Sequence, residues 1–132
     1  MKKIILVMLS LMLASAAGAQ EKFENQTMEQ IVVDDYQIIS DKVEDGVRYV
    51  VAAPSAKVCS KQIDIQIKDD VILSVVYTRG CEGNAKGIGA LVKDMTVDEA
   101  IRRLEGITCG KRGTSCPDQL AKVLKALENQ SR

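Results

Sequence analysis

Residues 61–78 read KQIDIQIKDDVILSVVYT, and this stretch decides the fold class. Isoleucine occupies every second position from 63 to 67 and polar residues stand between, which is the pattern of a strand with one buried face. Asp69-Asp70 is a turn signal, and the apolar run over residues 71–78 can form the partner strand. We therefore predict an antiparallel hairpin over residues 61–78.

A second hairpin is predicted upstream, over residues 31–52. Residues 31–42 alternate imperfectly between apolar and polar types, and residues 47–52 form a second short apolar run. Glu44-Asp45-Gly46 between them is typical of a turn, because glycine accepts a positive φ without steric cost. Pro54-Ser55-Ala56 ends the strand pattern and leads into Cys59.

From Ala85 onward the hydrophobic period becomes helical. The first helix is expected to bury one face, formed by Ile88, Leu91 and Val92. Residues 96–99 (TVDE) are a capping box, in which a hydroxyl N-cap is followed three residues later by Glu. They open a second helix, which Gly106 ends through a left-handed turn.

A third helix is predicted after residues 114–118, which read TSCPD. Ser115 or Cys116 would be its N-cap, and Pro117 is tolerated in a first turn, where its missing N–H would have no partner anyway. A core stripe follows at helical spacing: Leu120, Val123, Leu124 and Leu127. Strands followed by helices predict an α+β domain, with an antiparallel sheet packed against two or three helices.

Residues 1–19 have the pattern of a bacterial secretory signal peptide. Lys2 and Lys3 form a basic start, residues 4–13 an apolar core, and Ala17-Gly18-Ala19 a cleavage site. The apolar core is short for a membrane span of about 20 residues, so we expect cleavage and no stable span afterwards. The mature protein would be exported to the periplasm or secreted, where thiols tend to pair. We assign residues 20–46 to an N-terminal extension with the first hairpin strand, and 47–132 to a four-cysteine domain.

Composition narrows the function classes. Lys+Arg and Asp+Glu stand at 18 each, so the chain lacks the basic excess of a nucleic-acid-binding domain. It contains no histidine, which removes the commonest general base and any Cys–His nucleophile pair. Cysteines and carboxylates remain as the side-chain metal ligands, and we assign no catalytic residue.

The four cysteines occupy loops and helix starts of the predicted fold, outside the apolar runs. Cys59 precedes a strand, Cys81 lies between a strand and a helix, Cys109 has a glycine neighbour in a loop, and Cys116 opens the last helix. The positive end of a helix dipole favours thiolate over thiol, which applies to Cys81 and Cys116. Thiolates bind metals and attack disulfides, so the cysteines are the candidate site.

Three strings resemble the TSCPD family of small bacterial domains: VCSKQIDIQI, GCEGNAKGIGALVKDMTVDEAI and GITCGKRGTSCPDQLAKVL. The resemblance runs from about Val47 to Leu127 and includes all four cysteines of the family pattern. The family is similar to the C-terminal extension of cobalamin-dependent ribonucleotide reductases and, distantly, to iron–sulfur scaffold proteins of the IscU type. In those scaffolds three cysteines and a carboxylate bind zinc or a nascent cluster.

The resemblance implies an IscU-like fold and a site for zinc or an iron–sulfur cluster, held by Cys59, Cys81, Cys109 and Cys116. The scaffolds have an Asp soon after the first cysteine, whereas Ser60 and Lys61 stand here, so we expect Cys109 to replace it as fourth ligand. Tetrahedral Zn²⁺ accepts four thiolates, and thiolates also hold iron–sulfur clusters. An accessory or scaffold role beside a protein partner would follow.

Two alternatives stay open at this point. In an oxidising compartment the cysteines can form disulfides, structural or redox-active, and a 109–116 bridge would close a small loop without any metal. The reductase resemblance instead implies an accessory domain in deoxyribonucleotide synthesis. The chain alone is too small to hold the catalytic barrel and cobalamin of such an enzyme, so its own enzymatic activity is left open.

Overall fold

The computed structural model describes residues 35–131. The predicted signal peptide at 1–19 and the first residues of the predicted strand at 31–42 lie outside this range. Four strands come first, β1 (Tyr36–Glu44), β2 (Val47–Pro54), β3 (Gln62–Lys68) and β4 (Val71–Thr78). Three α-helices and a short 3₁₀ turn follow, α2 (Glu82–Val92), α3 (Val97–Leu104), η1 (Gly110–Arg112) and α4 (Cys116–Gln130).

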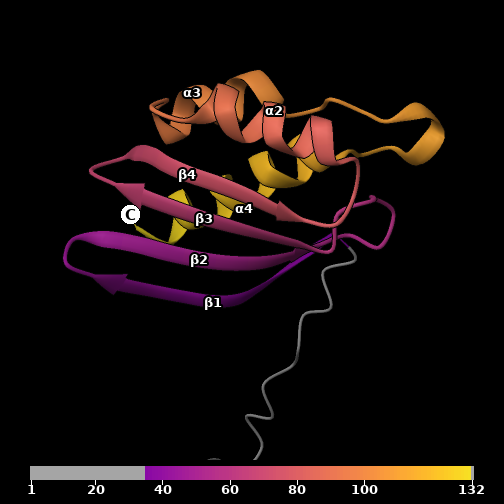
Figure 1. Ribbon diagram of the computed structural model, residues 1–132. Helices are drawn as coiled ribbons and strands as arrows, with labels where there is room; N and C mark the ends of the chain where they lie inside the picture. The colour runs from indigo at the N-terminus through magenta and orange to yellow at the C-terminus, as the bar shows by residue number, and fades with distance from the viewer. Residues whose placement is uncertain (1–34, 132) are drawn as a thin grey trace, which may run out of the picture. The chain divides into compact units, whose positions relative to one another are not determined.

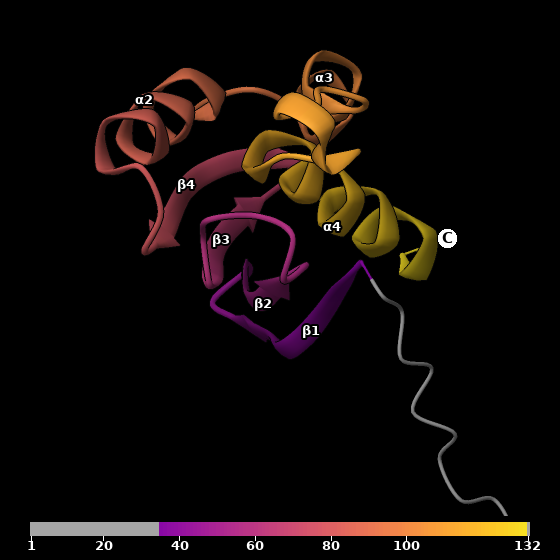
Figure 2. The ribbon, with the colours of Figure 1, turned by 90° about the vertical axis from the view of Figure 1, so that its right-hand side faces the viewer.

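The strands form one antiparallel sheet in the order β1-β2-β3-β4 (Figure 1). Helix α4 packs on β1 and β2, α3 packs on α4, and α2 lies along β4 at the edge of the sheet, as Figures 1 and 2 show. The predicted α+β class and antiparallel sheet are confirmed. None of the helices in residues 35–131 is long and apolar enough to cross a bilayer.

Both predicted hairpins form, and their turns use left-handed residues. Asp45 and Gly46 have φ of 50° and 75°, and Asp69 and Asp70 have φ of 48° and 65°. Two positive φ values in succession match the right-handed twist of the flanking strands, and Asp tolerates this conformation because its short side chain bonds locally. Strand β4 has the predicted bounds, and β3 begins one residue later than predicted.

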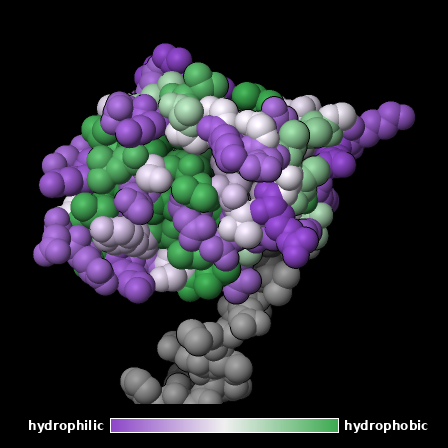
Figure 3. Space-filling view, viewed as in Figure 1, coloured by the Kyte–Doolittle hydropathy of each residue, from purple (hydrophilic) through white to green (hydrophobic). Residues whose placement is uncertain are grey.

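The core lies between the sheet and α4. The alternating isoleucines of β3 and the predicted stripe of α4 are buried, together with apolar residues of β2, β4 and α3: Val50, Ala52, Ile63, Ile65, Ile67, Ile72, Val75, Val97, Ile101, Leu120, Val123, Leu124 and Leu127. On the side of the molecule seen in Figure 3, hydrophobic and hydrophilic residues are interspersed. Helix α4 therefore supplies the main apolar cover of one sheet face.

Helix α2 differs from the prediction in two respects. It begins at Glu82, three residues before the predicted start, and Leu91 is 72% exposed instead of buried. The helix turns toward β4 around Gly89, whose missing side chain leaves room for the Val75 carbonyl oxygen. Successive residues of a helix are rotated by about 100°, so Gly89 and Leu91 project on opposite sides of Ile88. Leu91 therefore points away from the side that approaches β4. Because α2 approaches β4 at Gly89, the buried face of the helix differs from the predicted one.

Candidate functional site

The four cysteines line a single cavity of about 400 Å³. Cys59 comes from the β2–β3 loop, Cys81 is the N-cap of α2, Cys109 precedes η1, and Cys116 is the first residue of α4. All four are free thiols; three are exposed and Cys116 is half-buried. Residues distributed over 58 positions of the sequence therefore meet at one end of the sheet.

Gly80 brings the segments that carry Cys59 and Cys81 together. Its φ is +95°, and a Cβ added there would lie 3.2 Å from the backbone nitrogen of Ser60. A side chain at position 80 would thus press on the backbone after Cys59. Lys61 N also donates to Thr78 O at 2.9 Å, which extends the β3–β4 pairing toward the cavity.

Two hydroxyl groups hold Cys116 from the sheet side. The Ser60 hydroxyl donates to Cys116 Sγ at 3.2 Å, and the Tyr77 hydroxyl donates to the Cys116 carbonyl oxygen at 3.2 Å. Burial raises the pKa of Tyr77 far above its usual range, and the Cys116 thiol adds to this shift. The phenol consequently stays protonated and remains a donor at any physiological pH.

Arg112 contributes a cation to the cavity. Its Nη1 donates to Cys59 Sγ at 3.1 Å, 53 residues away in sequence. This hydrogen bond and the charge of Cys59 raise the pKa of Arg112, with smaller contributions from Cys109 and Cys116. The guanidinium therefore lies in the electrostatic reach of three of the four sulfur atoms.

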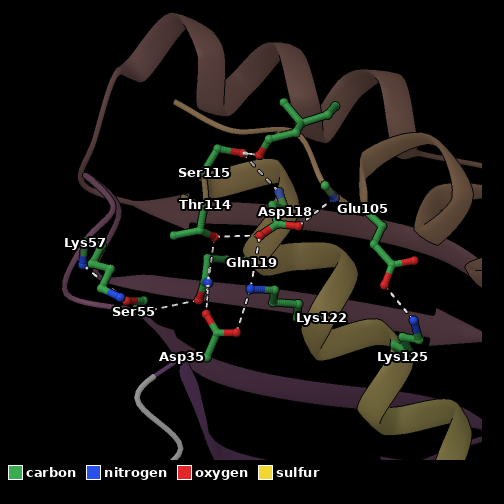
Figure 4. Close-up of polar contacts among 12 residues, drawn as sticks. Asp35, Ser55, Lys57, Glu105, Thr114, Ser115, Asp118, Gln119, Lys122 and Lys125 are labelled. Carbon is green, nitrogen blue, oxygen red and sulfur yellow. Dashed lines mark hydrogen bonds and ion pairs between the residues drawn. The ribbon is translucent and has the colours of Figure 1, made fainter. Parts of the chain in front are cut away.

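The loop that carries Cys109 is fastened to the first turn of α4. Ser115 is the N-cap of α4 and its hydroxyl accepts from Asp118 N, as predicted for one of the two candidate caps. The same hydroxyl donates to Ile107 O at 2.6 Å, and Cys109 N donates to Thr114 O at 3.1 Å. Figure 4 shows Ser115 beside Thr114 and Asp118 at this turn.

The donor set suits a metal that prefers sulfur, although the thiols are not gathered around one point. Within residues 35–131, no three Cys, Asp or Glu side chains stand close enough to hold one ion as they are. The cavity is otherwise largely apolar, with Val58, Ile88 and Ile107 among its lining residues. The structure thus brings the four predicted residues to one cavity, and metal coordination stays a prediction.

A family model described as the TSCPD domain matches residues 35–128. The chain belongs to the TSCPD domain family. The resemblance inferred from the three cysteine-bearing strings is confirmed, and the match begins earlier than Val47, so that it includes strand β1. No curated protein matches this TSCPD domain, and no solved structure matches it. The likeness to IscU-type scaffolds stays a prediction.

Several polar residues of the site in this TSCPD domain carry no recognisable signal in the sequence. In the sequence Ser60 is only a departure from the scaffold pattern, yet its side chain is 1% exposed and contacts Cys116. Tyr77 and Gln119 lie inside a strand and a helix whose periodicity predicts packing only. Tyr77 bonds Cys116, 39 residues away, and Gln119 bonds Ser55 and Asp35, 64 and 84 residues away, so no local signal predicts these contacts.

Proposed function

We propose that this TSCPD domain binds zinc or an iron–sulfur cluster through the thiolates of Cys59, Cys81, Cys109 and Cys116. The observation that carries the proposal is that every cysteine of the chain lines the same cavity. Four cysteines from four separate segments would not be expected to share a cavity if they were unrelated core or surface residues. The role is that of a binding or scaffold protein, and no catalytic step is assigned.

The chemistry of the ligands favours this class of metal. Zn²⁺ takes four thiolates in tetrahedral geometry, and iron–sulfur clusters are held by the same ligands. Mg²⁺ and Ca²⁺ prefer oxygen ligands, which an all-sulfur set does not offer. The chain has no histidine that could complete a mixed site. Sulfur is therefore the donor atom that decides the preference.

The surroundings of the sulfurs support the same proposal. Ser60 and Arg112 each donate a hydrogen bond to a cysteine sulfur, and such bonds are stronger when the acceptor is ionised. Cys81 and Cys116 stand at the N-termini of α2 and α4, where the helix dipole favours a negative sulfur. Both features suit sulfur ligands that carry negative charge when they bind a metal.

Export is part of the proposal. Residues 1–19 carry the signal-peptide pattern, so the mature chain would begin at Gln20 and act outside the cytosol. The mass of the chain recovered from a periplasmic or culture fraction tests this directly. Recovery of the uncleaved chain in the cytosol would overturn export and would favour the accessory role in deoxyribonucleotide synthesis that the family resemblance implies.

The test of metal binding is a count of thiols and metals on chain purified anaerobically and then denatured. We expect four titratable thiols per chain, released together with about one equivalent of zinc, or a visible charge-transfer band if the site holds an iron–sulfur cluster. Absence of titratable thiols until a reductant is added would establish disulfides and contradict the proposal. Four thiols without metal, even after incubation with Zn²⁺, would also contradict it.

Single Cys→Ser variants then test each ligand. Each of the four substitutions should weaken Zn²⁺ binding in a chelator competition. Leu91→Ala is the matched control, because the Leu91 side chain is 72% exposed and does not line the cysteine cavity. A cysteine whose replacement leaves the affinity unchanged is not a ligand.

A further inference from the structure

A chain of hydrogen bonds, buried except at its partly buried Gly106 end, connects the loop that carries Cys59 with the loop that carries Cys109. It runs from Ser55 through Gln119, Thr114 and Asp118 to Gly106 (Figure 4). Gln119 is 0% exposed, and Thr114 and Asp118 are also buried. The three side chains come from the TSCPD string and the residue that follows it.

Gln119 is the centre of this chain. Its Oε1 accepts from Ser55 N at 2.8 Å, and its Nε2 donates to Thr114 Oγ1 at 2.9 Å and to Asp35 Oδ1 at 2.6 Å. Ser55 in turn holds the turn that leads to Cys59, because its Oγ accepts from Lys57 N and its carbonyl oxygen from Val58 N. The position of Cys59 is thereby tied to helix α4.

Asp118 holds the other end. Its Oδ2 accepts from Thr114 Oγ1 at 2.6 Å and its Oδ1 from Gly106 N at 2.7 Å, where the Cys109 loop begins. Lys122 lies 3.2 Å from Asp118 Oδ2 and 2.6 Å from Asp35 Oδ2, so the two carboxylates share one cation. No buried side-chain nitrogen or oxygen in residues 35–131 lacks a partner, so this network is fully satisfied.

We propose that Thr114, Asp118 and Gln119 are positioning residues that set the spacing between the Cys59 loop and the Cys109 loop. The inference rests on the proposed function, since the spacing matters for a ligand held by both loops. An apolar residue at position 119 would fill the same core volume, but it could not hold the Ser55 backbone. Each end of the network meets the backbone of a cysteine-bearing loop, which a purely structural core contact would not require.

The expected change in metal affinity can be taken from other metal sites. Residues that orient metal ligands through hydrogen bonds typically change metal affinity by about 10- to 100-fold when they are replaced. Buried polar networks also act as units, so the loss of one member affects the others. Thr114 both donates to Asp118 and accepts from Gln119, which makes it the direct link between these two residues. A longer route between them runs through Asp35 and Lys122.

The matched test compares Thr114→Val with Thr114→Ser. Valine keeps the shape of the threonine side chain without its hydroxyl, and serine keeps the hydroxyl. The readouts are Zn²⁺ affinity by chelator competition and the alkylation rate of each cysteine in metal-free protein, measured by mass spectrometry. We expect Thr114→Val to bind Zn²⁺ about 10-fold or more weakly and to change alkylation at Cys109 relative to Cys81, while Thr114→Ser resembles the wild type. Val97→Ala, buried on α3 outside the cavity, controls for stability loss alone.

Equal Zn²⁺ affinity and equal alkylation rates in Thr114→Val and wild type would overturn the inference, as would the same losses in Val97→Ala. If the wild type binds no metal, the proposed function fails, and the alkylation rates still decide whether the network sets the loops. Should Thr114→Val not fold, Gln119→Leu is measured in the same way, since it removes the bond that holds Ser55 N, and equal Zn²⁺ affinity and alkylation rates in this variant and the wild type would overturn the inference.

Discussion

The hydroxyl of Ser60 donates to Sγ of Cys116 at 3.2 Å, although 56 residues separate the two in sequence. Ser60 lies in the loop before β3 and Cys116 in the first turn of α4, so this bond joins the sheet to the last helix. It is also a direct contact between a buried hydroxyl and one of the four sulfurs of the cavity. Single substitutions at contacts of this kind test metal binding, core packing and stability at low pH.

Ser60→Ala should weaken Zn²⁺ binding by about 10-fold, because Cys116 loses the donor that orients its sulfur and stabilises its negative charge. The measurement is chelator competition on chain stripped of metal. Ser74→Ala is the control: it removes a hydroxyl from a half-buried residue of β4 that does not line the cysteine cavity, and it should leave the Zn²⁺ affinity unchanged. An affinity of Ser60→Ala equal to that of Ser74→Ala would show that the hydroxyl does not act on the site.

Metal removal should lower the stability of the wild type. A ligand that binds only the folded state at 1,000 times its Kd contributes about 4 kcal/mol, so chelation should lower the free energy of unfolding by this order. Urea unfolding with Zn²⁺ and with chelator measures the difference. Cys81→Ser should show a much smaller difference, whereas a wild type equally stable under both conditions would argue against a bound metal.

Gly89→Ala should destabilise the fold by about 1–3 kcal/mol, as overpacking does. The added Cβ would lie 2.5 Å from the Val75 carbonyl oxygen, so α2 must move away from β4. Gly87→Ala in the same helix is the control, since nothing lies within 4 Å of its added Cβ. We expect this control to stabilise by up to about 1 kcal/mol through helix propensity, and both values come from thermal unfolding.

Stability should fall on acidification because of Asp118 and Asp35. Burial opposes their ionisation, but hydrogen bonds from Thr114 and Gly106, and the ion pair with Lys122, hold the pKa of Asp118 below its usual value. The pKa of Asp35 is lowered likewise: hydrogen bonds from Lys122 and Gln119 outweigh its burial. A lowered folded-state pKa means that the stabilisation is complete above about pH 4 and is lost as the pH falls through the lowered pKa.

Asp118→Asn tests this pH dependence. The variant should be less stable than the wild type at pH 7 by about 1–3 kcal/mol, because buried hydrogen bonds are broken, and should lose less stability between pH 5 and about pH 2. Asp98→Asn is the control, because its side chain is 65% exposed on α3. Parallel pH curves for wild type and Asp118→Asn would refute the role of this carboxylate.

Local patterns predicted most of the secondary structure. The isoleucine alternation of β3, the capping threonine at position 96 and the N-cap at Ser115 all act over a few residues, and each forms as the sequence indicates. The helical period wrongly predicts that Leu91 is buried, because its burial depends on how closely α2 approaches β4. That distance is set by Gly89 and the Val75 carbonyl oxygen, which belong to different elements.

The sequence by itself determined the strands, the places of their turns, the caps at Thr96 and Ser115, the family and the identity of the four cysteines, because each depends on neighbours along the chain. Only the tertiary structure decided that these cysteines share one cavity, that Ser60 and Arg112 contact their sulfurs, and that Gln119 joins their loops. Those contacts join residues 53 to 64 positions apart, and such pairs meet only when the sheet and α4 bury their apolar faces against each other.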